Sequence, residues 1–72
     1  MLTIDKAKVE IAQAKKGIPS GKLNELAGLS KSTYWTMMRG KPCKPISVYK
    51  LAKALGVDAT EILKESEGAN NG

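Results

Sequence analysis

Residues 30–40, SKSTYWTMMRG, predict a short helix whose two faces differ in chemistry. Ser30 suits the helix N-cap, because its hydroxyl can accept a hydrogen bond from the unpaired amides of the first turn. Gly40 suits the left-handed residue that follows a helix end. Tyr34, Met37 and Met38 stand at i, i+3 and i+4 and form one apolar stripe. The opposite face carries side chains that can hydrogen-bond, stack or neutralise phosphate: Lys31, Ser32, Trp35, Thr36 and Arg39. This helix is expected to be held by a core while it contacts a partner.

A second short helix precedes this one and is expected to end at Ala27. Either Ser20 caps it or Pro19 occupies its first turn, and the local sequence fits both choices. The buried side of this helix is expected to comprise Leu23, Leu26 and Ala27. Gly28 can supply the positive φ of a tight turn, after which Leu29 points inward. Two short helices joined through a turn with a glycine are typical of a helix-turn-helix.

Three further helices are predicted on either side of this pair. Residues 4–16 predict a first helix, with Thr3 as its cap and Gly17 at its end. Its buried face is expected to contain Ile4, Ala7, Ile11 and Ala14, with Val9, Ala12 and Gln13 beside it. Residues 46–55 predict a fourth helix that ends at Gly56. Its buried stripe is expected to contain Val48, Leu51, Ala52 and Leu55. Tyr49 is expected to pack in the core as well, with a hydroxyl that points toward a phosphate as the less favoured alternative. Asp58 and Glu61 form a capping-box pattern that predicts a fifth helix through Ile62 and Leu63.

The length of 72 residues fits a single domain near the lower limit for folding without disulfides or metals. We expect an all-α, compact five-helix domain over residues 1–65. Residues 66–72, SEGANNG, have little to bury and are expected to form a disordered tail.

The residue types present argue against an enzyme. The chain has no His and a single cysteine, so the usual general base, a disulfide and a Cys/His metal site are all missing. We therefore expect no enzymatic activity, no cofactor, no metal and no small-molecule ligand. Cys43 is expected to be a buried or half-buried thiol in a loop, with a redox switch as the less favoured alternative. No apolar run approaches the roughly 20 residues that span a bilayer, and we expect a cytoplasmic protein without membrane association.

The positive charge of the chain is concentrated in its centre. Residues 15–53 contain nine basic residues and only one acidic residue, Glu25. Residues 1–14 are electrically balanced, and residues 54–72 are acidic overall. A basic centre suggests a surface that meets a polyanion, although ordinary solubility charge is the plain alternative.

The central sequence resembles the phage-repressor class of helix-turn-helix proteins, the Cro/C1 or XRE family. The resemblance covers residues 17–63, about two-thirds of the chain. It rests on the joint spacing of several pieces: Gly17-Ile18, Leu23, Gly28-Leu29-Ser30, the Ser-Thr-aromatic run, Arg39-Gly40, and KLAKALGV at residues 50–57. The chain departs from the family where Ser20 replaces a common Gln. It also has Gln13 and Met38 where many members pair an Arg with a Glu, so neither charge is left alone.

This resemblance implies a lambda-repressor-like domain whose third helix, about residues 31–39, enters the major groove of DNA. The base-contacting residues would be Lys31, Ser32, Trp35 and Thr36. The phosphate-contacting residues would be Ser20, Lys22, Ser30, Arg39, Lys41 and Lys44. Two alternatives remain for Trp35: it contacts the DNA wall or a thymine methyl, or it folds onto Leu29 and the second helix.

The implied partner is double-stranded DNA, bound by a transcriptional regulator of repressor-like, phage or mobile-element type. A homodimer is expected at least on DNA, because groove-reading helices work in two-fold pairs on neighbouring half-sites. The alternative is a small antitoxin or anti-repressor-like module whose main partner is a protein. Its binding would depend little on salt.

Overall fold

The computed structural model describes residues 2–19 and 21–64, and this part of the chain is mostly helical. Four α-helices follow one another: α1 (Lys6–Lys16), α2 (Leu23–Ala27), α3 (Lys31–Met38) and α4 (Pro45–Leu55). One turn of 3₁₀-helix, η1 (Ala59–Glu61), comes last. Within the described ranges no strand is present, which confirms the all-α class. The expected tail at residues 66–72 lies outside the described residues, and none of the described helices is long and apolar enough to cross a membrane.

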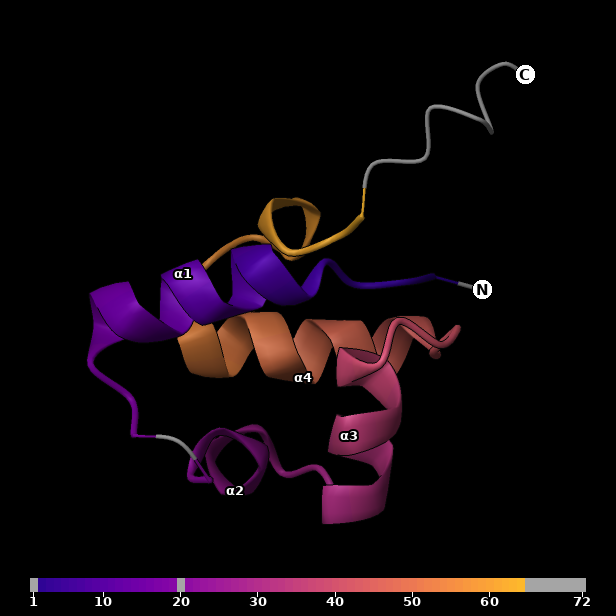
Figure 1. Ribbon diagram of the computed structural model, residues 1–72, viewed down its shortest axis with the longest axis horizontal. Helices are drawn as coiled ribbons and strands as arrows, with labels where there is room; N and C mark the ends of the chain where they lie inside the picture. Colours follow the sequence, from indigo (N-terminus) through magenta and orange to yellow (C-terminus); the bar gives the residue numbers. More distant parts are fainter. Residues whose placement is uncertain (1, 20, 65–72) are drawn as a thin grey trace.

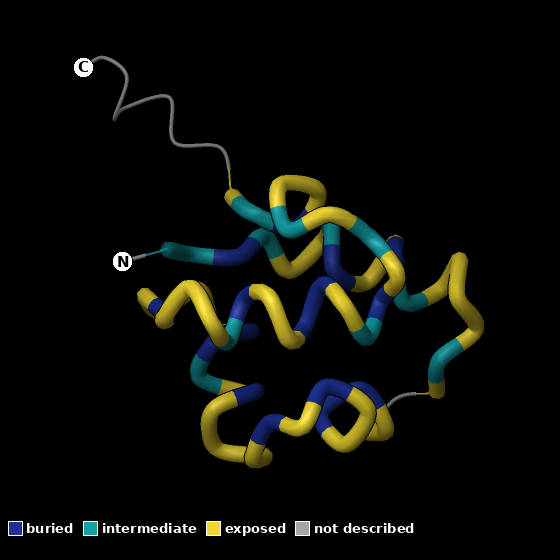
Figure 2. The backbone as a smooth tube through the Cα atoms, turned by 180° about the vertical axis from the view of Figure 1, so that it is seen from behind, coloured by how far each residue is buried: buried dark blue, intermediate teal, exposed yellow. Residues whose placement is uncertain are grey.

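Helix α4 lies at the centre of the arrangement (Figure 1). α1 runs along one side of it, and α2 and α3 lie on the other side. Each helix has buried and exposed residues along its length (Figure 2), and the buried apolar ones form one hydrophobic core. The largest fully buried side chains are Ile4, Val9, Leu23, Met37, Val48, Leu51 and Ile62.

Helix α3 confirms the sequence prediction in its cap and its buried stripe. The Ser30 hydroxyl accepts a hydrogen bond from the Thr33 amide at 3.1 Å, and the helix begins at Lys31. Tyr34, Met37 and Met38 are all buried. The helix ends at Met38, and Gly40 follows with a φ of 83°.

Helices α2 and α3 are joined by residues 28–30, as expected from the glycine. Gly28 has a φ of 71°, a conformation that only glycine adopts without strain, and Leu29 is buried. α2 itself buries Leu23 and Ala27, but Leu26 is 61% exposed, so its predicted burial is wrong. The buried face of α2 contains the polar residue Asn24 in addition to Leu23 and Ala27.

The predicted start and phase of the first helix are wrong. Asp5, not Thr3, is the N-cap, because its carboxylate accepts from the Ala7 amide at 3.0 Å. Ile4 is buried, but it precedes the helix in an extended segment and does not set the helical phase. The buried helical positions are Val9 and Ala12, one turn apart, whereas Ile11 is 57% exposed. Ala7 and Ala14 are exposed as well.

Helix α4 has the predicted stripe of Val48, Leu51, Ala52 and Leu55, all buried, and it ends at Gly56. It begins at Pro45, one residue earlier than expected, because proline is well suited to a first helical turn. Tyr49 is 54% exposed, so its expected place in the core is wrong. Its ring lies 5.9 Å from the Lys53 ammonium, which covers part of the aromatic face.

The predicted fifth helix is wrong, because the chain makes only one 3₁₀ turn at η1. The Glu61 carboxylate accepts from the Asp58 amide at 3.4 Å, as the capping pattern suggested. The helix stops because the following backbone pairs with the N-terminal segment. Asp5 donates its amide to the Ile62 carbonyl at 2.8 Å, and Lys64 donates to the Thr3 carbonyl at 2.9 Å. This pairing draws the two ends of the described chain together.

The same N-terminal segment also holds the loop between α3 and α4. Leu2 and Cys43 exchange two backbone hydrogen bonds as an isolated antiparallel bridge. The Cys43 thiol also donates to the Leu2 carbonyl at 3.1 Å. Cys43 is thus a buried loop thiol, as predicted, and its hydrogen bonds hold the end of the loop between α3 and α4.

Candidate nucleic-acid interface

Helix α3 packs into the core through its inner face and exposes its outer face to solvent. Lys31 and Ser32 are exposed, and Thr36 is half-buried. The buried Tyr34, Met37 and Met38 fix the rotation of the helix, so the three polar side chains share a defined outward direction.

Trp35 stays 48% exposed on this face. Its indole meets the Tyr34 ring edge-to-face, with ring centroids 5.1 Å apart and an interplanar angle of 73°. This contact restricts the indole, because aromatic pairs favour an edge-to-face geometry. About half of the surface of Trp35 therefore remains open to a partner, with the indole packed against Tyr34.

A hollow of about 310 Å³ separates α3 from the start of α4. Among its lining residues, four carry hydroxyl groups and one is basic: Ser32, Thr33, Thr36, Ser47 and Lys44. Hydroxyl and ammonium groups of this kind bind phosphate or base edges. The structure therefore brings Ser32 and Thr36 together with Lys44, as the predicted interface requires.

The sequence pattern does not single out Thr33 or Ser47. Both line the hollow, although Thr33 also accepts a hydrogen bond from the Ser30 hydroxyl at 3.0 Å. The signal for Ser47 was its place in the first turn of α4, where a helix offers partial positive charge to an anion. Thr33 had no such signal, because only the packing of α3 beside the loop brings it into the hollow.

Arg39 lies apart from this group. It lines a second hollow of about 230 Å³ together with Lys6 and Lys64, beside Asp5. The basic residues Lys6 and Lys64 come from distant parts of the sequence and were not expected near it. Arg39 therefore extends the basic surface from the end of α3 toward the N-terminal segment.

The remaining expected phosphate contacts differ in their availability. Lys41 and Lys44 are exposed. The Lys22 ammonium lies 3.6 Å from the Glu25 carboxylate, so part of its charge is balanced. The Ser30 hydroxyl is engaged at Thr33 as a helix cap. Ser20 lies outside the described residues.

All charged residues in the segment from α3 through α4 are basic. Residues 31–53 contain six basic residues and no acidic residue. The six are Lys31, Arg39, Lys41, Lys44, Lys50 and Lys53. Such a segment has a positive potential that attracts phosphate, and Asp5 from the N-terminal segment opposes it only beside Arg39 among the lining residues of the two hollows.

The buried titratable groups near the interface remain uncharged at neutral pH. Burial raises the pKa of the Cys43 thiol above its ordinary value. Burial, with a smaller effect from the charge of Glu10, raises the pKa of the Tyr34 hydroxyl as well. Both groups therefore serve packing and hydrogen bonding. No group of three potential metal ligands occurs in the part of the chain that the structure describes.

Comparisons with models of protein families, with curated proteins and with solved structures found no match to this chain.

Proposed function

We propose that this chain is a sequence-specific DNA-binding transcriptional regulator, repressor-like and of phage or mobile-element type. In this proposal α2, the turn at residues 28–30 and α3 form the helix-turn-helix of a lambda-repressor-like domain. The observation that carries the proposal is the outer face of α3. It combines polar side chains, a core-fixed rotation and an adjoining segment without acidic residues.

Base reading is assigned to the outer face of α3. Lys31 can donate to guanine O6 and N7, and Ser32 and Thr36 can donate to or accept from base edges. The methyl group of Thr36 suits a thymine methyl. Trp35, which is 48% exposed, would contact the groove wall.

Phosphate binding is assigned to the residues around this helix. Lys41 and Lys44 are exposed in the loop before α4, and Ser47 lies in the first turn of that helix. Arg39 would bind a phosphate further along, beside Lys6 and Lys64. These contacts would set the register of α3 without reading sequence themselves.

A helix of eight residues reads few base pairs, so one copy of the chain would have limited specificity. Two copies on half-sites about one helical turn apart would multiply it. The homodimer on DNA is therefore part of the proposal.

Salt dependence tests the DNA-binding claim. We expect log Kd for a random duplex to rise linearly with log salt, with a slope of about 3 or more, because each neutralised phosphate contributes roughly 0.9. Lys41→Ala should reduce this slope by about 1. Lys15→Ala removes an exposed lysine from α1, on the far side of α4, and should leave the slope unchanged. A flat slope would reject DNA binding and favour the protein-binding antitoxin or anti-repressor alternative.

A further inference from the structure

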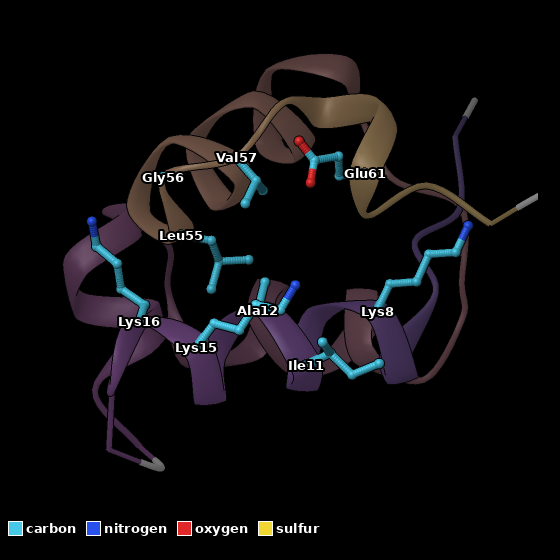
Figure 3. A pocket seen from close by; sticks show the side chains of 9 residues that line it. All are labelled: Lys8, Ile11, Ala12, Lys15, Lys16, Leu55, Gly56, Val57 and Glu61. Atoms are coloured by element: carbon cyan, nitrogen blue, oxygen red, sulfur yellow. The ribbon is translucent and has the colours of Figure 1, made fainter.

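A second surface feature lies away from α3, between α1 and the segment that runs from the end of α4 to η1. It is an open groove of about 450 Å³ (Figure 3). Leu55 and Val57 point into it from one side, and α1 contributes Ala12 and Ile11 from the other. A volume of this size lies within the range of roughly 300–1,000 Å³ that is typical of ligand-binding pockets.

Ile11 gives this groove an exposed apolar edge. It is 57% exposed, although Ala12 beside it is buried. An exposed isoleucine leaves apolar surface in contact with water, which is unfavourable in free energy. The groove beside it has an apolar floor. The exposed side chain therefore extends the floor to the molecular surface.

The charged residues around the floor are mainly basic. Lys8, Lys15 and Lys16 line the groove, opposed by Glu61. Lys16 lies across the end of α4, because a Cβ built on Gly56 would meet its ammonium at 3.1 Å. Lys8 donates to the Leu63 carbonyl at 3.3 Å. The groove therefore combines an apolar floor with a rim of net positive charge.

The occupant must supply both apolar side chains and negative charge. Duplex DNA offers phosphates but no aliphatic or aromatic side chain to fill the floor. Residues 65–72 of this chain, ESEGANNG, contain carboxylates but no large apolar residue. A second copy carries the same net charge of +5, which opposes docking at a basic rim. Charge and shape together favour a different protein with an acidic, amphipathic segment.

We propose that this groove binds an acidic amphipathic segment of a partner protein. One or two large apolar side chains of the segment lie against Leu55, Val57 and Ile11, and its carboxylates lie beside Lys15 and the neighbouring lysines. Because α1 and α3 lie on opposite sides of α4, the partner can bind while α3 is in contact with DNA (Figure 1). This surface is independent of the proposed DNA-binding function.

The test starts from a displayed library of random 12-residue peptides, selected against the full chain at low salt. We expect the selected peptides to combine Asp or Glu with Leu, Ile, Phe or Trp. One selected peptide is then synthesised, and its Kd is measured with variants of the groove. Ile11→Ala should weaken binding about tenfold, because it removes apolar area from the contact. Lys15→Glu should weaken it by a similar factor, and less so at high salt.

Two matched controls change the same residue types elsewhere. Ile46 is 55% exposed on α4, and Ile46→Ala should leave the peptide Kd unchanged. Lys50→Glu reverses an exposed charge outside the groove and should change the Kd less than twofold. Since Ile11 is exposed and alanine favours helix, Ile11→Ala should fold, which a circular dichroism spectrum verifies.

Four results would overturn the proposal. The first is a selection without acidic and apolar enrichment, and the second is an equal loss of affinity in groove and control variants. The third is a self-association in sedimentation that Ile11→Ala abolishes, because the occupant would then be a second copy. The fourth is a loss of duplex affinity in Lys15→Glu that exceeds the loss in Lys50→Glu. DNA binding itself is measured separately through Lys41→Ala, so failure of the groove and failure of DNA binding are distinguishable.

Discussion

The hydroxyl group of Ser30 makes two hydrogen bonds at the start of α3. It accepts from the Thr33 amide at 3.1 Å and donates to the Thr33 hydroxyl at 3.0 Å. A residue expected to contact phosphate therefore has a structural role in the free protein. It fixes the first turn of the helix that carries Lys31 and Ser32.

Ser30→Ala should lower the free energy of unfolding by about 1 kcal/mol, because the Thr33 amide loses its cap. Ser32→Ala is the matched control in the same turn, and it should change the free energy by less than about 0.5 kcal/mol. Urea denaturation of the two variants measures both values. An equal effect of the two substitutions would contradict the capping role of Ser30.

Cys43 should make the stability depend on pH in the alkaline range. Burial raises the folded-state pKa of its thiol above the unfolded-state value. Its contribution to stability is therefore complete below the unfolded-state pKa, roughly 8.5, and is lost as the pH rises through the folded-state pKa. We expect the free energy of unfolding to fall from pH 8 to pH 10, and to fall less in Cys43→Ala. Parallel pH profiles for the two proteins would show that burial of Cys43 does not shift its pKa.

At the scale of the element, α2 contains two leucines that the sequence pattern predicts to be buried, and only one of them is. Leu23 is fully buried, whereas Leu26, three residues later, is 61% exposed. In a helix of only five residues the apolar pattern is too short to fix the rotation. The packing of α2 on α4, which places Asn24 and Ala27 in the buried face, decides it.

Leu23→Ala should therefore lower the free energy of unfolding by about 3 kcal/mol, because it leaves a cavity in the core. Leu26→Ala should change it by less than about 0.5 kcal/mol. Both values come from denaturant titrations at one temperature. A large loss of unfolding free energy in Leu26→Ala would mean that Leu26 is buried, and that α2 is rotated from the orientation described above.

Helices α3 and α4 show when an element can be predicted from its own residues. Each has apolar residues at i, i+3 and i+4, and the glycines Gly40 and Gly56 adopt positive φ just beyond their ends. α1 is rich in alanine, so its sequence offers several faces of similar hydrophobicity. Its true phase follows from the burial of Val9 and from Asp5 as cap.

At the scale of the molecule, the N-terminal segment forms long-range backbone pairs that the sequence pattern does not predict. Leu2 pairs with Cys43, and Ile4 pairs with Leu63, across long distances in the sequence. The pairing around Leu63 takes the place of the expected fifth helix, of which a single turn remains. Local patterns carry no information about such pairing.

The candidate interface was predictable to a similar degree. The apolar stripe of α3 predicts which residues lie on its opposite, exposed face. Lys31, Ser32 and Trp35 could therefore be identified as exposed residues from the sequence. The hollow shared with Ser47, and the grouping of Arg39 with Lys6 and Lys64, required the packed structure. The groove beside Ile11 was hidden for the same reason, because the sequence placed Ile11 in the core.

The central claim is that α3 reads base sequence, and a selection from a random duplex pool tests it most directly. The chain and its variants Lys31→Ala, Thr36→Ala and Lys41→Ala are each taken through the same selection at one salt concentration. We predict that the chain enriches a defined motif and that Lys31→Ala and Thr36→Ala relax it at particular positions, each at a cost of about 1–3 kcal/mol. Lys41→Ala should bind more weakly but select the same motif. Enrichment of no motif, or the same motif from Lys31→Ala and Thr36→Ala, would contradict sequence reading by α3.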